Sequence, residues 1–173
     1  MPGRSALLVI APERFRDEEL AEPRRALEAA GHHVTVASTR PGRARGMLGA
    51  EVAIERTISG PGPDPDLLVI VGGSGSPDHL WDSEPLRNLV ARMHAAGKPL
   101  GAICLSPPVL ARAGVLNGVR ATTWPEPRAI LELKRGGATY VEQPVVRDGG
   151  IVTADGPNAA AEFGGVLVTL LEQ

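Results

Sequence analysis

PLGAICLSPPVL, residues 99–110, places the single cysteine of the chain between an apolar run and a helix start. The run 99–103 is short and continuously apolar, which is typical of a strand covered on both faces of a sheet. Ser106 is a favourable N-cap residue and Pro107 a favourable first helical residue, because the N–H that proline lacks would have no intrahelical partner there. The stretch therefore predicts a strand, a tight turn at Cys104 and a helix.

Two further apolar runs of the same type occur earlier in the chain, at residues 6–11 and 67–71. Helical spacing of apolar residues covers 17–31 and 83–98, and 33–38 is a β-branched strand pattern. This alternation of strands and helices predicts a parallel sheet between two layers of helices.

Three segments have less regular patterns. Pro23 fits the first predicted helix only if it lies in the first turn. The sequence STRPGRARG, residues 38–46, predicts a solvated loop or, alternatively, a basic patch for an anion or a partner, formed by Arg40, Arg43 and Arg45. Residues 51–57 form a candidate short strand.

The last part of the chain predicts a hairpin and a helix. Asp148 and Gly149 form a turn signal between two β-branched runs, and residues 157–173 form a closing helix despite their glycines.

Length and composition limit the class of protein. A chain of 173 residues with 43% hydrophobic and 22% charged residues predicts one globular domain, residues 1–173. A net charge of −2 argues against nucleic-acid binding by phosphate neutralisation. One cysteine without zinc-ligand spacing predicts a reducing compartment and metal-free chemistry. The run 6–11 is too short for a signal peptide or a membrane span, so we expect a cytoplasmic protein with no membrane partner.

Cys104 has two interpretations. Free cysteine is among the most buried residue types, so an inert structural thiol is one of them. The other is a nucleophile at a strand-to-helix elbow, where the partial positive charge of a helix N-terminus lowers the thiol pKa. The Ser-Pro pair that follows favours the nucleophile.

Other candidate residues follow the remaining strands. Gly72 and Gly73 can present backbone N–H groups to an anion, although a plain turn, taken alone, explains them better. Glu19 is an acidic candidate, but residues 17–19 are all acidic and suit a helix N-terminus, so spacing alone does not choose among them. His79 is the histidine nearest to the double glycine.

The ordered set of motifs resembles the DJ-1/ThiJ/PfpI superfamily, whose fold is like that of class I glutamine amidotransferases. The similar segments are GGSGSP (72–77), AICLSPPVLARAGVLNGVRAT (102–122) and GGATYVEQPVVRDGGIVTADGP (136–157). The resemblance spans nearly the whole chain. It implies a flavodoxin-like three-layer α/β/α sandwich, with a mostly parallel central sheet and a nucleophile elbow at Cys104.

The resemblance also implies roles for individual residues. The family places its active-site carboxylate four residues before a proline, which selects Glu19 before Pro23. Cys104 would be the nucleophile and Glu19 the acid and base hydrogen-bonded to its sulfur. The N–H groups of Gly73 and Leu105 would donate to a developing oxyanion.

The chain departs from the family at three positions. PfpI-type members have histidine directly after the cysteine, where this chain has Leu105, and DJ-1-like members have histidine where this chain has Trp124. Ser106 replaces the usual glycine. These departures argue against a Cys-His-acid peptidase site, although His79 could substitute. We expect Gly72, Trp124 and His79 to contribute to the substrate pocket.

The expected function is a cofactor-independent, cysteine-dependent enzyme that acts on small reactive carbonyls, of the glyoxalase III or deglycase kind. A Cys104–Glu19 pair suffices for this chemistry. One alternative is a non-enzymatic redox sensor or chaperone-like stress protein, because a low-pKa thiol beside N–H donors can hold a sulfinate. The other is a PfpI-like intracellular cysteine peptidase or a hydratase. The expected partners are a small carbonyl substrate and a second copy of the chain in a homodimer.

Overall fold

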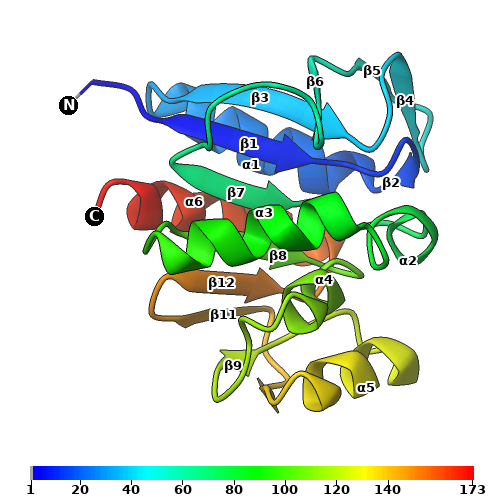
Figure 1. Ribbon diagram of the computed structural model, residues 1–173, viewed down its shortest axis with the longest axis vertical. Helices are drawn as coiled ribbons and strands as arrows, with labels where there is room; N and C mark the ends of the chain where they lie inside the picture. Colours follow the sequence, from blue (N-terminus) through cyan, green and yellow to red (C-terminus); the bar gives the residue numbers. More distant parts are fainter. Residues whose placement is uncertain (1) are drawn as a thin grey trace.

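A mostly parallel sheet of seven strands forms the centre of the computed structural model, which describes residues 2–173 (Figure 1). The order across the sheet is β11-β12-β8-β7-β1-β3-β6. Neighbouring strands are parallel except at the β11–β12 hairpin. The strands are β1 (Ser5–Val9), β3 (His33–Ser38), β6 (Arg56–Thr57), β7 (Leu67–Ile70), β8 (Leu100–Ile103), β11 (Val145–Asp148) and β12 (Ile151–Ala154).

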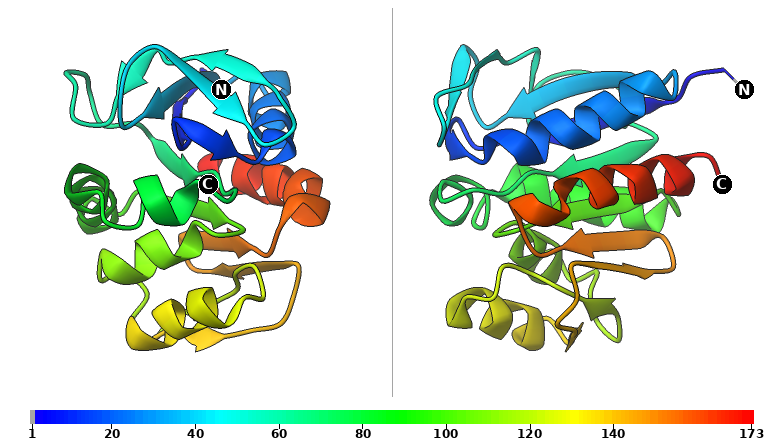
Figure 2. Two further views of the ribbon diagram at one scale, coloured as in Figure 1. Left: turned by 90° about the vertical axis from the view of Figure 1, so that its right-hand side faces the viewer. Right: turned by 180° about the vertical axis from the view of Figure 1, so that it is seen from behind.

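Helices cover both faces of this sheet, which gives the predicted three layers (Figures 1 and 2). Helices α1 and α6 lie side by side on one face, and α3 and α4 lie on the other. None of the helices within residues 2–173 is long and apolar enough to cross a bilayer. The helices are α1 (Asp17–Ala29), α2 (Ser76–His79), α3 (Glu84–Ala95), α4 (Pro107–Arg112), α5 (Pro127–Arg135), the 3₁₀ helix η1 (Pro157–Ala159) and α6 (Ala160–Leu171).

The continuous apolar runs are the strands at the centre of the sheet. Every residue of β7 and β8 is buried, because helices pack on both faces of these strands. The Asp148-Gly149 turn joins β11 to β12 as predicted, and the closing helix is present as α6. The sequence therefore predicted the central elements correctly.

Pro23 does not lie in the first turn of α1, contrary to the sequence expectation. The helix begins at Asp17 and continues through Pro23, whose ring is buried. Proline has no N–H, so the carbonyl of Glu19 loses its intrahelical donor. The helix persists because the residues around Pro23 keep α1 packed against α6.

A small sheet of three strands takes up part of the predicted loop and part of the predicted short strand. Arg43 and Arg45 lie on β4 (Arg43–Gly46), which pairs with β2 (Glu13–Phe15) and β5 (Glu51–Ala53). The predicted strand 51–57 is divided, because β5 joins this small sheet and β6 joins the central one. Strand formation at 43–46 and the division of 51–57 both depend on pairing with distant backbone, which local propensity cannot predict. The other small sheet pairs β9 (Arg120–Ala121) with β10 (Thr139–Tyr140).

Phe163 should contribute strongly to stability. Its side chain is fully buried on α6, and its ring packs against Gly101 of β8. Phe163→Ala would leave a cavity in this layer, and we expect a loss of about 3–5 kcal/mol in the free energy of unfolding, measured by urea denaturation. Leu131→Ala on α5 is a suitable control, because Leu131 is 45% exposed and should cost less than about 1 kcal/mol. Equal losses in the two variants would contradict this account of the core.

Candidate active site

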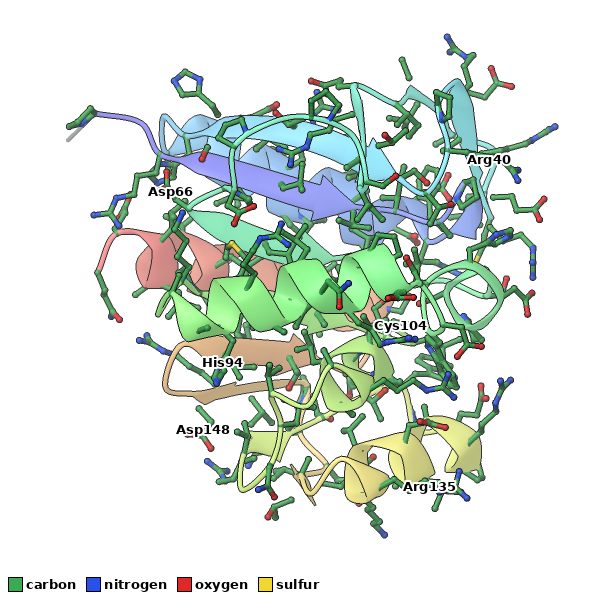
Figure 3. The ribbon with its side chains drawn as sticks, viewed as in Figure 1. Arg40, Asp66, His94, Cys104, Arg135 and Asp148 are labelled. Carbon is green, nitrogen blue, oxygen red and sulfur yellow. The ribbon has the colours of Figure 1, made fainter. Side chains whose placement is uncertain are left out.

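Cys104 lies in a tight turn between β8 and α4, at the end of the sheet toward which β7 and β8 point (Figures 1 and 3). Its backbone has φ 63°, in the left-handed region that residues other than glycine adopt only at an energetic cost. Its N–H donates to the Ala154 carbonyl at 2.9 Å. Its own carbonyl accepts from the Trp124 N–H at 2.8 Å and from Thr123 Oγ1 at 2.7 Å. These bonds hold the strained turn in place, so the predicted nucleophile elbow is present.

Ser106 occupies the predicted N-cap position, but its hydroxyl does not cap the helix. The hydroxyl donates to the Val71 carbonyl at 2.7 Å and lies 2.8 Å from Ser76 Oγ. Two prolines begin α4, so no N–H is available at the first two helical positions, and the Val109 N–H is bonded to the Ser106 carbonyl. Ser106 therefore ties the elbow to the end of β7.

Glu19 projects from α1 to the elbow and is 0% exposed. Gly72 lies between the two predicted catalytic side chains. A Cβ placed on Gly72 would be 2.5 Å from Cys104 Cβ and 2.7 Å from Glu19 Oε1, so only glycine fits there. Within residues 2–173 neither carboxyl oxygen of Glu19 has a hydrogen-bond partner of standard geometry. The fold thus brings a fully buried carboxyl group to the cysteine, with the Cys104 thiol and the Gly72 N–H nearby as weak donors.

Burial raises the pKa of Glu19 to about 8. The nearby Cys104 thiol, the Arg16 charge and the Gly72 N–H each lower this pKa, but they offset only part of the effect of burial. Glu19 is therefore mainly a neutral carboxylic acid at pH 7, able to donate a proton.

The pKa of Cys104 is raised, which contradicts the depressed value expected from the helix start. Burial is the largest cause and the Glu19 carboxylate the second, while the N–H groups of Gly73 and Leu105 lower the pKa. The sequence could not report that the residue is only 7% exposed or that α4 is only six residues long. Protonation of Glu19 removes the charge that opposes the thiolate, so the two titrations are coupled.

Gly73 and Leu105, the two predicted backbone donors, lie beside Cys104, and their N–H groups lower the pKa of its thiol. Gly73 has φ 115°, and a Cβ there would be 2.4 Å from the Arg14 carbonyl oxygen and 2.5 Å from the Arg16 nitrogen. The double-glycine loop is therefore pressed against the backbone of β2 and the start of α1. Any side chain at Gly73 would move this donor away from the sulfur.

A pocket of about 270 Å³ opens beside Cys104, and Trp124 lines it as expected, together with the two backbone donors Gly73 and Leu105. Gly72 was also expected there but is not among the lining residues, because it lies between the Cys104 and Glu19 side chains. Trp124 is 43% exposed and forms part of the rim. Five residues that the sequence analysis missed complete the lining: Arg16, Met47, Ser74, Glu126 and Pro157. Arg16, Met47 and Glu126 come from separate parts of the chain that no motif marks, whereas Ser74 and Pro157 lie within the similar segments 72–77 and 136–157. The Arg16 guanidinium is held by Glu18 at 2.8 and 3.0 Å.

His79 does not line this pocket. Its ring nitrogen lies 3.0 Å from Glu13 Oε1, because α2 directs the side chain toward β2. None of the histidines within residues 2–173 is among the lining residues. The structure therefore gives no support to His79 as a substitute for the family histidine.

A larger cavity, of about 540 Å³, lies beneath the loop 60–65 and against β1 and β3. It contains none of the predicted site residues. The smaller pocket at Cys104 is therefore the candidate active site.

The sequence is similar to those of several known proteins. MJ0967 of Methanocaldococcus jannaschii is 46% identical over 174 residues, which cover 100% of this chain and 85% of that protein. A protein of Pyrococcus abyssi named a deglycase is 33% identical over 152 residues, which cover 87% of this chain and 90% of that protein.

Solved structures share the fold. A ThiJ/PfpI domain protein from Brachyspira murdochii has a TM-score of 0.91 and 30% identity, covering 99% of this chain and 98% of its own. DJ-1beta of Drosophila melanogaster has a TM-score of 0.84 and 28% identity, covering 99% of this chain and 92% of its own. The model of the DJ-1/PfpI family matches residues 4–170, and the chain belongs to this family.

Proposed function

We propose that this protein is a cofactor-independent enzyme that acts on small reactive carbonyls, with Cys104 as the nucleophile and Glu19 as the acid and base. The observation that carries the proposal is the fully buried Glu19 carboxyl group, with its pKa raised to about 8, next to the thiol in the elbow. The deglycase name of the Pyrococcus abyssi relative supports the same class of reaction.

With methylglyoxal as substrate, the first step forms a carbon–sulfur bond. The Cys104 thiol passes its proton to the Glu19 carboxylate, and the resulting thiolate attacks the aldehyde carbon. The new alkoxide then takes the proton back from the Glu19 acid. The N–H groups of Gly73 and Leu105 stabilise negative charge on the sulfur before attack and on the oxygen after it. The product is a hemithioacetal beside a Glu19 carboxylate.

The second step is an isomerisation followed by hydrolysis. The Glu19 carboxylate removes the proton from the former aldehyde carbon and returns it to the neighbouring carbon, while the hydroxyl proton moves between the two oxygens. The resulting lactyl thioester is cleaved by water, which releases lactic acid, regenerates the Cys104 thiolate and reprotonates Glu19. Methylglyoxal and water are thus converted to lactate and a proton, with no cofactor consumed.

The pocket favours this reaction over the two alternatives. A redox sensor needs a thiol that is ionised at rest, whereas burial raises the pKa of Cys104 and the proposed enzyme forms its thiolate through Glu19 during turnover. A peptidase of the Cys-His kind needs a histidine beside the thiol, and no histidine within residues 2–173 lines the pocket. A volume of about 270 Å³ also suits a small molecule better than a peptide. The homodimer and the cytoplasmic location stay predictions.

The proposal is tested by incubating the protein with methylglyoxal in the absence of added thiol or cofactor. We expect steady release of lactate, many molecules per protein chain, measured with lactate dehydrogenase. Two parallel assays test the alternatives: mass spectrometry after mild peroxide and a fluorogenic peptide panel. Absence of lactate, together with selective addition of oxygen to Cys104 or with peptide cleavage, would overturn the proposal.

A further inference from the structure

The peptide that joins Cys104 to Leu105 is held from one side. It carries the Cys104 carbonyl and the Leu105 N–H, and because the described backbone contains no cis peptide these two groups point in opposite directions. Fixing the carbonyl therefore fixes the direction of the N–H. The carbonyl accepts two hydrogen bonds, from the Trp124 N–H at 2.8 Å and from Thr123 Oγ1 at 2.7 Å.

Thr123 acts on this peptide from outside the pocket. It is 0% exposed, and it is not among the residues that line the pocket at Cys104. It follows β9, so its hydroxyl reaches the elbow from a part of the chain that is 19 residues away. Thr123 is therefore placed to influence the sulfur through the peptide without touching a substrate.

We propose that Thr123 is a positioning residue, whose hydroxyl holds the Cys104 carbonyl and thereby aims the Leu105 N–H at the sulfur. The bond acts in two ways. It resists relaxation of the strained Cys104 backbone at φ 63°. It also polarises the amide, which makes the N–H a stronger donor to a thiolate. The inference rests on the proposed function only in that it takes the Leu105 N–H as a donor in the reaction.

Thr122 provides a matched control in the neighbouring position. It is also buried, at 1% exposure, but its Oγ1 has no hydrogen-bond partner within residues 2–173. Thr122→Val and Thr123→Val therefore make the same chemical change in similar surroundings, and only the second removes a bond to the elbow.

The test compares Thr123→Val, Thr123→Ser and Thr122→Val with the wild type. The first measurement is the rate of Cys104 alkylation by iodoacetamide as a function of pH, which reports ionisation of the thiol without any turnover. We expect Thr123→Val to move the alkylation midpoint to higher pH, because the thiolate loses part of its stabilisation. Thr123→Ser and Thr122→Val should keep the wild-type midpoint.

The second measurement is turnover of methylglyoxal. We expect Thr123→Val to lower kcat about tenfold, the effect of one hydrogen bond, with KM within about twofold. Thr123→Ser should restore kcat, because it keeps the hydroxyl. If the wild type itself shows no turnover, the proposed function fails while the alkylation measurement still tests Thr123.

Two results would overturn the inference. One is a folded Thr123→Val protein, judged by circular dichroism, whose alkylation midpoint equals that of the wild type. The other is a shift in Thr122→Val as large as that in Thr123→Val, since packing would then explain both. If Thr123→Val does not fold, Thr123→Ala takes its place in the same comparison.

Discussion

Cys104→Ser is expected to lower kcat/KM for methylglyoxal by about a thousandfold or more. The serine hydroxyl has nearly the shape of the thiol, but it ionises far less readily, so the same N–H donors cannot supply a comparable nucleophile. The measurement is lactate release under steady-state conditions, with protein concentration and folding checked by circular dichroism.

His79→Asn is the matched control for a mechanism without histidine. The His79 ring contacts Glu13 and lies outside the pocket lining, so this variant should keep kcat/KM within about twofold of wild type. Substantial activity in Cys104→Ser would contradict the nucleophile, and a large loss in His79→Asn would contradict the two-residue mechanism.

Glu19→Gln is expected to make the protein more stable above neutral pH while it removes activity. The pKa of Glu19 is about 8 in the folded protein against an ordinary value of 4.5, so folding favours the neutral acid. Its stabilising contribution is complete below about pH 4.5 and is lost as the pH rises to about 8. The shift corresponds to at most about 5 kcal/mol. Cys104 does not alter this window, because its raised pKa makes it ionise only at higher pH.

The measurement is the free energy of unfolding, by urea denaturation, at several values between pH 5 and pH 8.5. Wild type should lose a few kcal/mol over this range, and Glu19→Gln should lose much less. The amide cannot exchange a proton with the substrate carbon, so kcat should fall about a hundredfold or more. Wild-type stability that does not change with pH would contradict the buried acid.

Glu18→Gln is the control for Glu19→Gln, because it makes the same substitution at the preceding residue of α1. Glu18 is paired with Arg16, which lowers its pKa, so its stabilising contribution is present above its ordinary pKa and is lost only in acid. We therefore expect Glu18→Gln to keep the wild-type pH dependence between pH 5 and pH 8.5. It should also keep most of the activity, although Arg16 lines the pocket.

The sequence pattern alone does not identify the active-site carboxylate among the three acidic residues 17–19 at the start of α1. The resemblance to the family selected Glu19. In the fold, Asp17 accepts from the N–H groups of Leu48 and Ala50, and Glu18 pairs with Arg16. Only Glu19 is fully buried beside the thiol. Which face of the helix meets the sheet is a tertiary property, since all three residues suit a helix N-terminus equally.

The sequence by itself determined the order of elements, the parallel sheet and the elbow at Cys104. Short continuous apolar runs such as 67–71 and 99–103 are typical of strands covered on both faces, and the Ser-Pro pair, separated from the second run by two residues, favours a helix start. Only the tertiary structure decided the pKa values of Glu19 and Cys104 and the hydrogen bonds that hold the elbow. The pKa of Glu19 depends on how much water the surrounding elements exclude, and the bond from Thr123 to Cys104 joins residues that fold topology alone brings together.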